Sequence, residues 1–340
     1  MPPASPHQPR LPYAAGAAGA LLIAFSAIFV RLADVSPATA AVFRCVYALP
    51  ALGLLALWER RRFGPRPWRR RVPAFGAGLF FSADLLLWHH SIHYIGAGLA
   101  TVLGNAQVVL VGLVAWVVLR ERPGPNVLVA VPVVLAGGVL ISGVVGTGAY
   151  GSDPARGAVY GLLTAVAYTG FILLLRHSNA DVRRPAGPLM DASAAGALGA
   201  AVGGLLAGDL SLVPAWPAHG WLLALALGSQ VVGWLCISVS LPRLPAAVTS
   251  VLLMLQPVGS VLLGMLLLAE APSAVQLGGV VVVLAGVALA SLPGRRPPAL
   301  AGQDSASSGE PASPPSVEAA SPGSSAPEPA GDSAGADPRT

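Results

Sequence analysis

Residues 104–142 read GNAQVVLVGLVAWVVLRERPGPNVLVAVPVVLAGGVLIS, and residues 253–291 read LMLQPVGSVLLGMLLLAEAPSAVQLGGVVVVLAGVALAS. The two stretches are part of a longer match, in which residues 91–142 align without a gap on residues 240–291 at an offset of 149 residues. Of the 52 aligned pairs, 19 are identical. The chain therefore contains an internal repeat.

Polar and conformationally special residues carry most of the weight in this alignment, because chance matches among Ala, Val, Leu and Gly are frequent in a chain so rich in them. The informative aligned pairs are Gln107 with Gln256, Glu121 with Glu270, Pro123 with Pro272 and Ser142 with Ser291.

The composition around the repeat is that of a membrane protein. The chain has 340 residues, of which 54% are hydrophobic and only 10% are charged, and its mean hydropathy is +0.69. Soluble domains average about 25% charged residues, so a water-soluble enzyme is excluded. The net charge of +5 does not indicate a nucleic-acid partner, because the arginines lie between long apolar runs.

Ten apolar runs are each long enough to cross a bilayer, which requires roughly 20 residues. We therefore predict an all-α integral membrane protein with ten transmembrane helices. The runs cover residues 12–32, 37–58, 73–94, 97–119, 125–147, 155–176, 187–208, 217–239, 244–268 and 273–292.

Each copy of the repeat holds five of these runs. Because five is odd, the second copy must enter the membrane upside down relative to the first, so we predict two inverted five-helix repeats. The first covers residues 12–147 and the second covers residues 155–292, joined by an outer connection at 148–154. Inverted repeats with a site at their interface are typical of secondary transporters.

The distribution of arginine predicts the orientation. If the N-terminal segment 1–11 is cytoplasmic, the inner connections hold 16 Arg and the outer ones hold only Arg31 and Arg156, as the positive-inside rule requires. Residues 293–340 are then cytoplasmic too. Within them, residues 301–340 are mostly Ala, Ser, Pro and Gly, so we predict a disordered tail. The expected location is the inner (plasma) membrane, as a multi-pass protein.

Several short motifs resemble one transporter family. Ala-Leu-Gly-Ser-Gln at 226–230, Leu-Gln-Pro-Val at 255–258 and Leu-Leu-Leu-Ala-Glu at 266–270 are similar to the second repeat of EamA-type carriers of the drug/metabolite transporter superfamily. In the first repeat, Ala-Phe-Ser-Ala-Ile-Phe-Val at 24–30 and Leu-Arg-Glu-Arg-Pro at 119–123 resemble the matching family positions.

The resemblance implies ten helices and movement of small metabolites, often outward. We therefore expect a secondary transporter that exports small metabolites, amino-acid-like compounds or drugs. Gln256 departs from the family pattern, since many relatives carry Glu before this proline. A phosphate-binding loop is absent from the sequence, so we expect an ion or solute gradient to drive transport and expect no cofactor. The expected partners are a small-molecule substrate and membrane lipids, with the chain a monomer or a homodimer. The alternative is a non-transporting membrane protein, either an intramembrane enzyme or a scaffold.

Arg44 and Asp84 are the deepest ionisable residues in the predicted helices, at similar distances from the outer surface. Charges at such depth usually face a cavity or a partner. Three interpretations stay open: the two charges pair and pin their helices together; Arg44 attracts an anionic substrate group while Asp84 exchanges a proton or a cation; or the two do not meet.

Further polar and aromatic residues are candidates for the substrate path. Gln107 and Gln256 are related by the repeat, so we expect them to approach the pseudo-two-fold axis together, as cavity lining or as hydrogen-bonded contacts between helices. The other candidates, for which packing is the alternative role, are Trp88, Asn105, Tyr160, Tyr168, Gln230 and Trp234.

His89 and His93 share a helix face at i, i+4 spacing and form the only metal-like pattern in the chain. No third ligand with supporting spacing is visible, so we predict no metal site. A proton relay and ordinary polar contacts are the remaining roles. The arginines that follow Trp58 are expected to anchor helix ends to anionic lipid headgroups, with protein binding as the alternative.

Overall fold

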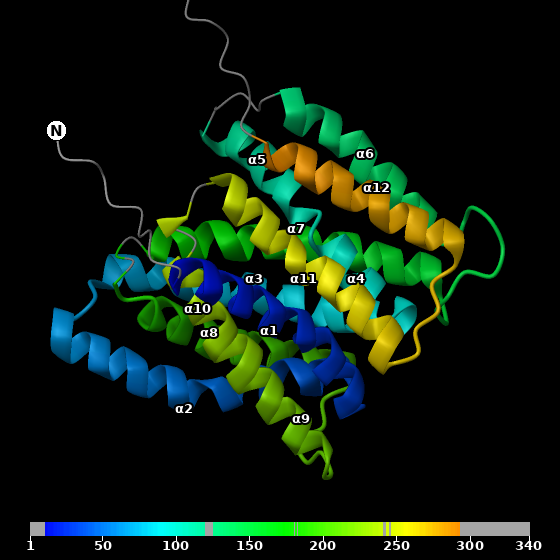
Figure 1. The fold of residues 1–340 in the computed structure, drawn as a ribbon. Coiled ribbons are helices and arrows are strands. Elements are labelled where there is room, and N and C mark those ends of the chain that lie inside the picture. Colours follow the sequence, from blue (N-terminus) through cyan, green and yellow to red (C-terminus); the bar gives the residue numbers. More distant parts are fainter. Residues whose placement is uncertain are drawn as a thin grey trace, which may run out of the picture. The chain divides into compact units, whose positions relative to one another are not determined.

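The computed structural model describes residues 11–119, 125–179, 181, 183–240, 243–244 and 246–292. Throughout these ranges every regular element is a helix, and none is a strand (Figure 1). In chain order the elements are α1 Leu11–Ala33, α2 Pro37–Phe63, α3 Trp68–Ile95, α4 Ala97–Gly104, α5 Gln107–Leu119, α6 Pro125–Ile141, α7 Pro154–Ser178, α8 Ala186–Ala207, α9 Ala218–Ala224, the π-helix η1 Leu225–Gly233, α10 Trp234–Ser240, α11 Ala246–Leu267 and α12 Ala274–Ser291.

Eight helical segments are long and apolar enough to cross a membrane, and two shorter apolar helices lie at Pro125–Ile141 and Leu252–Leu267. The prediction of an all-α protein with multiple membrane helices is therefore confirmed. The count of ten spans in two inverted repeats stays a prediction. The N-terminal segment, the residues around Glu121 and the tail from residue 293 onward lie outside the described residues.

Two of the predicted spans are interrupted helices. The segment expected at 97–119 is divided into α4 and α5 by a turn at Asn105 and Ala106, where Ala106 N–H donates to the carbonyl three residues back, on Leu103, and Nδ2 of Asn105 donates to the carbonyl of Thr101 at 2.8 Å. The segment expected at 217–239 contains the π-helix η1 between α9 and α10. π-helical turns are frequent at functional sites, and this one carries Gln230.

Helices from the two halves of the chain pack in antiparallel pairs. The end of α2 lies against the start of α8, where Glu59 accepts hydrogen bonds from the backbone N–H groups of Ala186 and Gly187. The start of α2 lies against the residues that follow α8, where Thr39 Oγ1 donates to the carbonyl of Ser211. In the same way α3 runs antiparallel to α7, and α1 runs antiparallel to α10.

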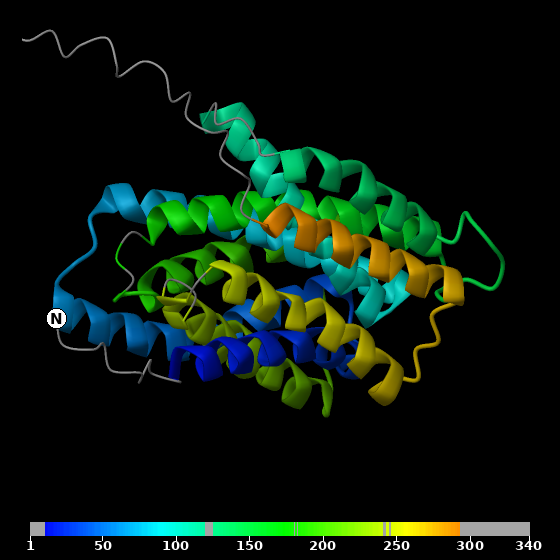
Figure 2. The same cartoon turned by 45° about the horizontal axis from the view of Figure 1, so that its top comes forward.

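Glycine permits close contact between α6 and α12, which lie side by side in both views of the fold (Figures 1 and 2). A Cβ atom at Gly137 would lie 2.9 Å from the carbonyl oxygen of Gly279, and one at Gly286 would lie 2.7 Å from Cγ2 of Val134. No larger residue fits without moving a helix, as in other small-residue contacts between membrane helices.

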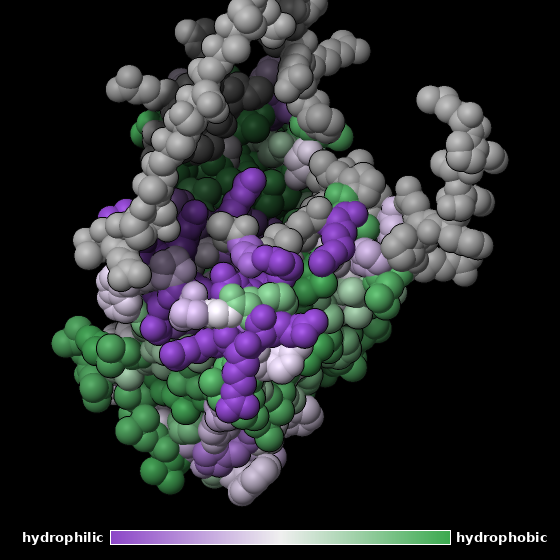
Figure 3. All heavy atoms as spheres, turned by 90° about the vertical axis from the view of Figure 1, so that its left-hand side faces the viewer, coloured by the Kyte–Doolittle hydropathy of each residue, from purple (hydrophilic) through white to green (hydrophobic). Residues whose placement is uncertain are grey.

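Arginines gather at one end of the bundle, where α2 ends and α3 and α8 begin. Arg70 there donates to the carbonyl of His177, and Arg184 donates to the carbonyls of Phe63 and Gly64. We call this the Arg-rich end, and hydrophilic side chains gather across it in Figure 3. Because α3 begins there, Arg156, which contacts Tyr94 near the end of α3, lies at the opposite end.

Candidate functional site

A cavity of about 50 Å³ lies among the helices, with lining from both halves of the chain. The lining residues from the first half are Ile23 and Ser26 of α1, Arg44 of α2, Phe81, Asp84, Leu85 and Trp88 of α3, Thr101 and Gly104 of α4, and Asn105 between α4 and α5. Those from the second half are Thr164 and Tyr168 of α7, Trp234 of α10 and Gln256 of α11. Seven of the ten residues singled out in the sequence are in this set. We call it the central cavity.

Arg44 is held in place by partners that leave part of its guanidinium free. Its Nε donates to Oε1 of Gln230 at 3.1 Å, and Nε2 of Gln230 donates in turn to Oγ of Ser193 at 3.1 Å. The guanidinium carbon lies 5.6 Å from the ring centre of Phe81 and 5.7 Å from that of Trp88. These contacts orient a buried cation without neutralising it.

Asp84 lies on the same cavity and is only 7% exposed. Within the part of the chain that the structure describes, it forms no ion pair with Arg44 and accepts no hydrogen bond. The direct pair considered from the sequence is therefore not formed in this conformation, in which Nε of Arg44 donates to Gln230 instead. A guanidinium and a carboxyl group thus share one cavity, and each has further hydrogen-bonding capacity.

Two further polar atoms beside the cavity have no hydrogen-bond partner in the described structure: Oγ1 of Thr164 and Nε1 of Trp234. Both residues line the cavity and are more than nine-tenths buried. Burying an unsatisfied donor costs about 1–3 kcal/mol. These atoms are therefore available to a polar ligand or to water in the cavity.

The remaining candidates lie elsewhere. Gln230 is fully buried and contacts Arg44 without being part of the cavity lining. Gln256 lines the central cavity, whereas Gln107 at the start of α5 is not among the lining residues. Tyr160 stacks instead on His90 and Tyr94, with ring centres 5.2 and 5.8 Å away.

Two histidines of α3 contact backbone carbonyls through Nδ1, and Nε2 of His89 has no hydrogen-bond partner in the described structure. His89 is buried and its Nδ1 lies 3.0 Å from the carbonyl oxygen of Pro37, whereas His90 contacts the carbonyl of Leu86. Across the described ranges, no group of three or more His, Cys, Asp or Glu side chains could hold a metal ion.

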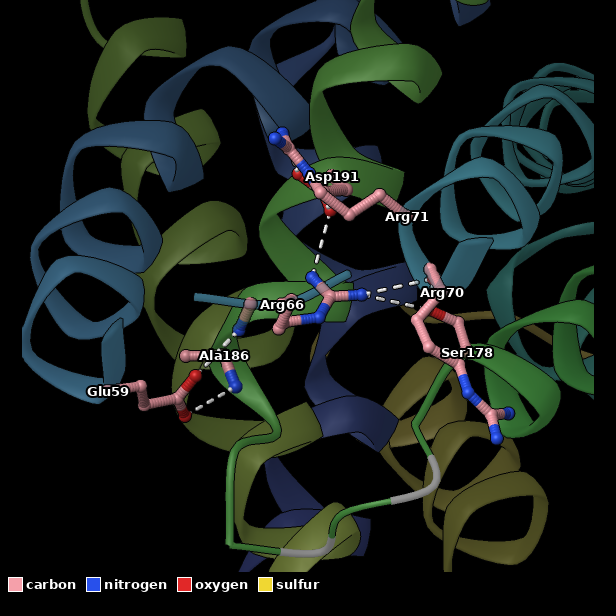
Figure 4. A network of polar contacts seen from close by, with 8 residues as sticks. Glu59, Arg66, Arg70, Arg71, Ser178, Ala186 and Asp191 are labelled. Carbon is pink, nitrogen blue, oxygen red and sulfur yellow. Dashed lines mark hydrogen bonds and ion pairs between the residues drawn. The ribbon is translucent and has the colours of Figure 1, made fainter. Parts of the chain in front are cut away.

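Sequence reasoning missed Thr164 and Ser26 at the central cavity, and it missed Asp191 at the Arg-rich end. Asp191 of α8 pairs with two arginines: Nη1 of Arg66 lies 2.9 Å from its Oδ2, and Nη2 of Arg71 lies 3.0 Å from its Oδ1 (Figure 4). A carboxylate five residues inside a predicted apolar span was the available signal, since such a charge requires a partner.

The fold and the cavity together define a class: a multi-pass membrane protein with a charged and aromatic cavity between helices from both halves of the chain. Residues 11–143 and 155–292 match the EamA-like transporter family. The chain belongs to that family, which confirms the resemblance seen in the short motifs. No curated protein matches the chain.

Among solved structures, one described only as "Crystal structure of protein" is similar to this chain. Its TM-score is 0.54 at 18% sequence identity, and the match covers 82% of this chain and 96% of that chain. At this level of identity the similarity concerns the fold alone.

Proposed function

We propose that the protein is a secondary transporter that moves a small, amino-acid-like metabolite out of the cell across the inner membrane. The observation that carries this proposal is the placement of Arg44 and Asp84 on one cavity without direct pairing. A guanidinium binds a carboxylate or another oxyanion, and a carboxylate binds an ammonium group or a proton. A zwitterion carries both complementary groups.

The size of the central cavity supports a mechanism with more than one conformation. A volume of about 50 Å³ holds a few water molecules, since one water requires about 10–15 Å³ on this measure. A metabolite needs more room, so the helices around the cavity must separate to admit it. We assign the described conformation to a narrow state between loading and release.

The packing of the helices supports the proposed ten-helix inverted repeat. Numbering the ten spans in order, the second packs on the seventh, the fifth on the tenth, the third on the sixth and the first on the eighth. If each span is replaced by the equivalent span of the other repeat, the second–seventh and fifth–tenth pairs stay the same, and the third–sixth pair becomes the first–eighth pair. The packing therefore has the symmetry that two equivalent repeats require. An exchange of conformation between the halves then converts one access state into the other.

The arginines at the Arg-rich end of the bundle support the proposed orientation, in which that end and both termini are cytoplasmic. An ion or solute gradient is the proposed energy source, and Asp84 is the proposed site of proton or cation exchange.

The test is transport by the full-length protein in liposomes, preceded by a comparison of metabolites released from cells with and without it. We expect release of at least one zwitterionic metabolite and saturable flux of that compound into protein-containing liposomes. Liposomes with an Arg44→Gln, Asp84→Asn double variant serve as the control. Absence of flux for every released compound, together with covalent turnover of any of them, would reject the proposal in favour of an enzyme.

A further inference from the structure

A second and larger cavity, of about 480 Å³, lies at the Arg-rich end between α2, α8, the start of α3 and the residues that precede α3 and α8. It shares no lining residue with the central cavity. Its volume falls within the range of about 300–1,000 Å³ that is usual for small-molecule sites. The lining consists of Gly53, Ala56, Leu57, Glu59, Arg60, Gly64, Pro65, Arg66, Arg71, Arg184, Gly187, Met190 and Asp191.

One side of this cavity carries a surplus of positive charge. Four arginines and two carboxylates line it, which leaves a net charge of +2. Both carboxylates are already engaged: Asp191 binds Arg66 and Arg71, and Glu59 accepts the backbone N–H groups that begin α8 (Figure 4). Arg60 is exposed and has no carboxylate partner within the described ranges.

The other side of the cavity is apolar. Gly53, Ala56 and Leu57 lie one to two turns before Arg60 on α2, and Met190 lies across from them on α8. A Cβ atom at Gly53 would meet only Sδ of Met190, at 4.0 Å. The apolar wall therefore lies on the membrane-spanning parts of both helices, and the charged wall lies where those helices end.

We propose that this cavity binds one anionic phospholipid from the leaflet at the Arg-rich end. The phosphate lies beside Arg60 and the other lining arginines, and the start of an acyl chain covers Gly53, Ala56 and Met190. Basic pockets between membrane helices bind anionic headgroups in this manner. A free phosphate ion fits the charged wall but leaves the apolar wall in contact with water. The proposal rests on α2 and α8 spanning a membrane, and not on transport.

Two substitutions test the two walls separately. Arg60→Gln removes the unpaired charge, and Gly53→Leu fills the apolar wall, where there is room for the added side chain. The matched controls are Arg61→Gln, an exposed neighbour that does not line the cavity, and Gly278→Leu on α12, where an added Cβ meets nothing within 4 Å. All four full-length variants are purified in detergent and titrated with dioleoyl phosphatidylglycerol, and bound lipid is counted by native mass spectrometry.

We expect the unmodified protein to bind one phosphatidylglycerol per chain in this cavity. Arg60→Gln should bind it about fivefold more weakly, and Gly53→Leu should not bind it. Both controls should bind as the unmodified protein does. Equal binding of phosphatidylcholine, or unchanged binding in both test variants, would overturn the proposal. Displacement of the lipid by glycerol 3-phosphate at matched concentration would also overturn it, because that result identifies a site for a free anion. A thermal melt of each lipid-free variant distinguishes lost binding from lost folding.

Discussion

The central cavity and the Arg-rich end contain the same two residue types in opposite arrangements. Asp84 and Arg44 lie on one cavity, yet the arginine is held by an uncharged glutamine and the aspartate has no described partner. Asp191, by contrast, has both of its carboxylate oxygens paired with arginines.

The difference separates two uses of buried charge in a membrane protein. A charge whose partners are all within the protein holds helices together, and its removal leaves an uncompensated partner. A charge oriented by neutral groups keeps its capacity for a ligand. We therefore expect substitutions of the central-cavity charges to impair flux, and substitution of Asp191 at the Arg-rich end to impair folding.

The largest effect is expected from the cavity charges. Arg44→Gln and Asp84→Asn should each reduce flux up to about 100-fold, because each removes a charge-assisted hydrogen bond between the cavity and the proposed substrate. The abundance of each variant in the membrane should stay near that of the unmodified protein. The double variant should not recover. Flux assays in liposomes, normalised to inserted protein, check this. Normal flux in the double variant would move the site to Gln256 and the aromatic residues.

Asp191→Asn should have the opposite pattern. It removes the shared partner of Arg66 and Arg71, and because Arg66 is largely buried we expect a loss of about 2–3 kcal/mol in stability. Flux per folded molecule should be unchanged. Thermal melts in detergent and a flux assay on the same preparation measure both quantities. A loss of flux at full stability would remove the distinction between the two regions.

Glu270 offers a third arrangement, a carboxylate whose hydrogen-bond donors among the described residues are all backbone N–H groups. Its oxygens accept from the N–H groups of Ala97, at 2.5 Å, and Gly98, at 3.1 Å, at the start of α4. Glu270→Ala leaves both donors without a partner and should cost about 2 kcal/mol, whereas Glu270→Gln keeps an acceptor and should cost less. Thermal melts of the two variants check the order.

Stability at this position should also depend on pH. Burial raises the pKa of Glu270 above its usual range, against the opposing effect of the two backbone hydrogen bonds. The folded chain therefore holds this proton more tightly than the unfolded chain does. The unmodified protein should lose stability relative to Glu270→Gln as the pH rises from about 4 through the raised pKa. A difference that stays constant with pH would contradict this sign.

Gln230→Glu tests the comparison between the central cavity and the Arg-rich end directly, because it gives Arg44 a carboxylate partner like the one that Arg66 has in Asp191. We expect flux to fall by about 10- to 100-fold, since a hydrogen bond to a charged group is worth roughly 1.5–3 kcal/mol and the substrate must now compete with it. The melting temperature should not fall. Gln230→Met is the control that removes the acceptor without adding charge. Unchanged flux in Gln230→Glu would show that Arg44 has no role in binding.

The smallest effect is expected at Asp181, which pairs with Arg183 and Arg184 on the surface of the Arg-rich end. Hydrogen bonds from Arg183 lower the pKa of Asp181 to about 2. Its contribution is therefore present above about pH 4 and lost as the pH falls toward 2. Solvent screens such pairs, so Asp181→Asn should change stability at pH 7 by no more than about 0.5 kcal/mol.

Much of the fold was predictable from the sequence because the membrane restricts the alternatives. A chain in hydrocarbon must satisfy its backbone hydrogen bonds within each segment, so runs of about 20 apolar residues become helices. The run predicted at 155–176 corresponds to α7 at Pro154–Ser178, and that at 187–208 to α8 at Ala186–Ala207. Charges and polar groups at membrane depth likewise pointed to Arg44, Asp84 and Gln256.

Only the tertiary structure decided which of these side chains meet. Gln107 and Gln256 occupy equivalent positions in the repeat, yet Gln256 alone lines the central cavity. Arg44 takes its partner 186 residues away in η1, and Arg66 takes Asp191, 125 residues away in α8. The physical reason is that a side chain's partner depends on how far each helix is rotated and where it crosses its neighbours. Those quantities follow from close packing between distant segments, such as Gly137 against Gly279, and not from the local pattern that forms the helix.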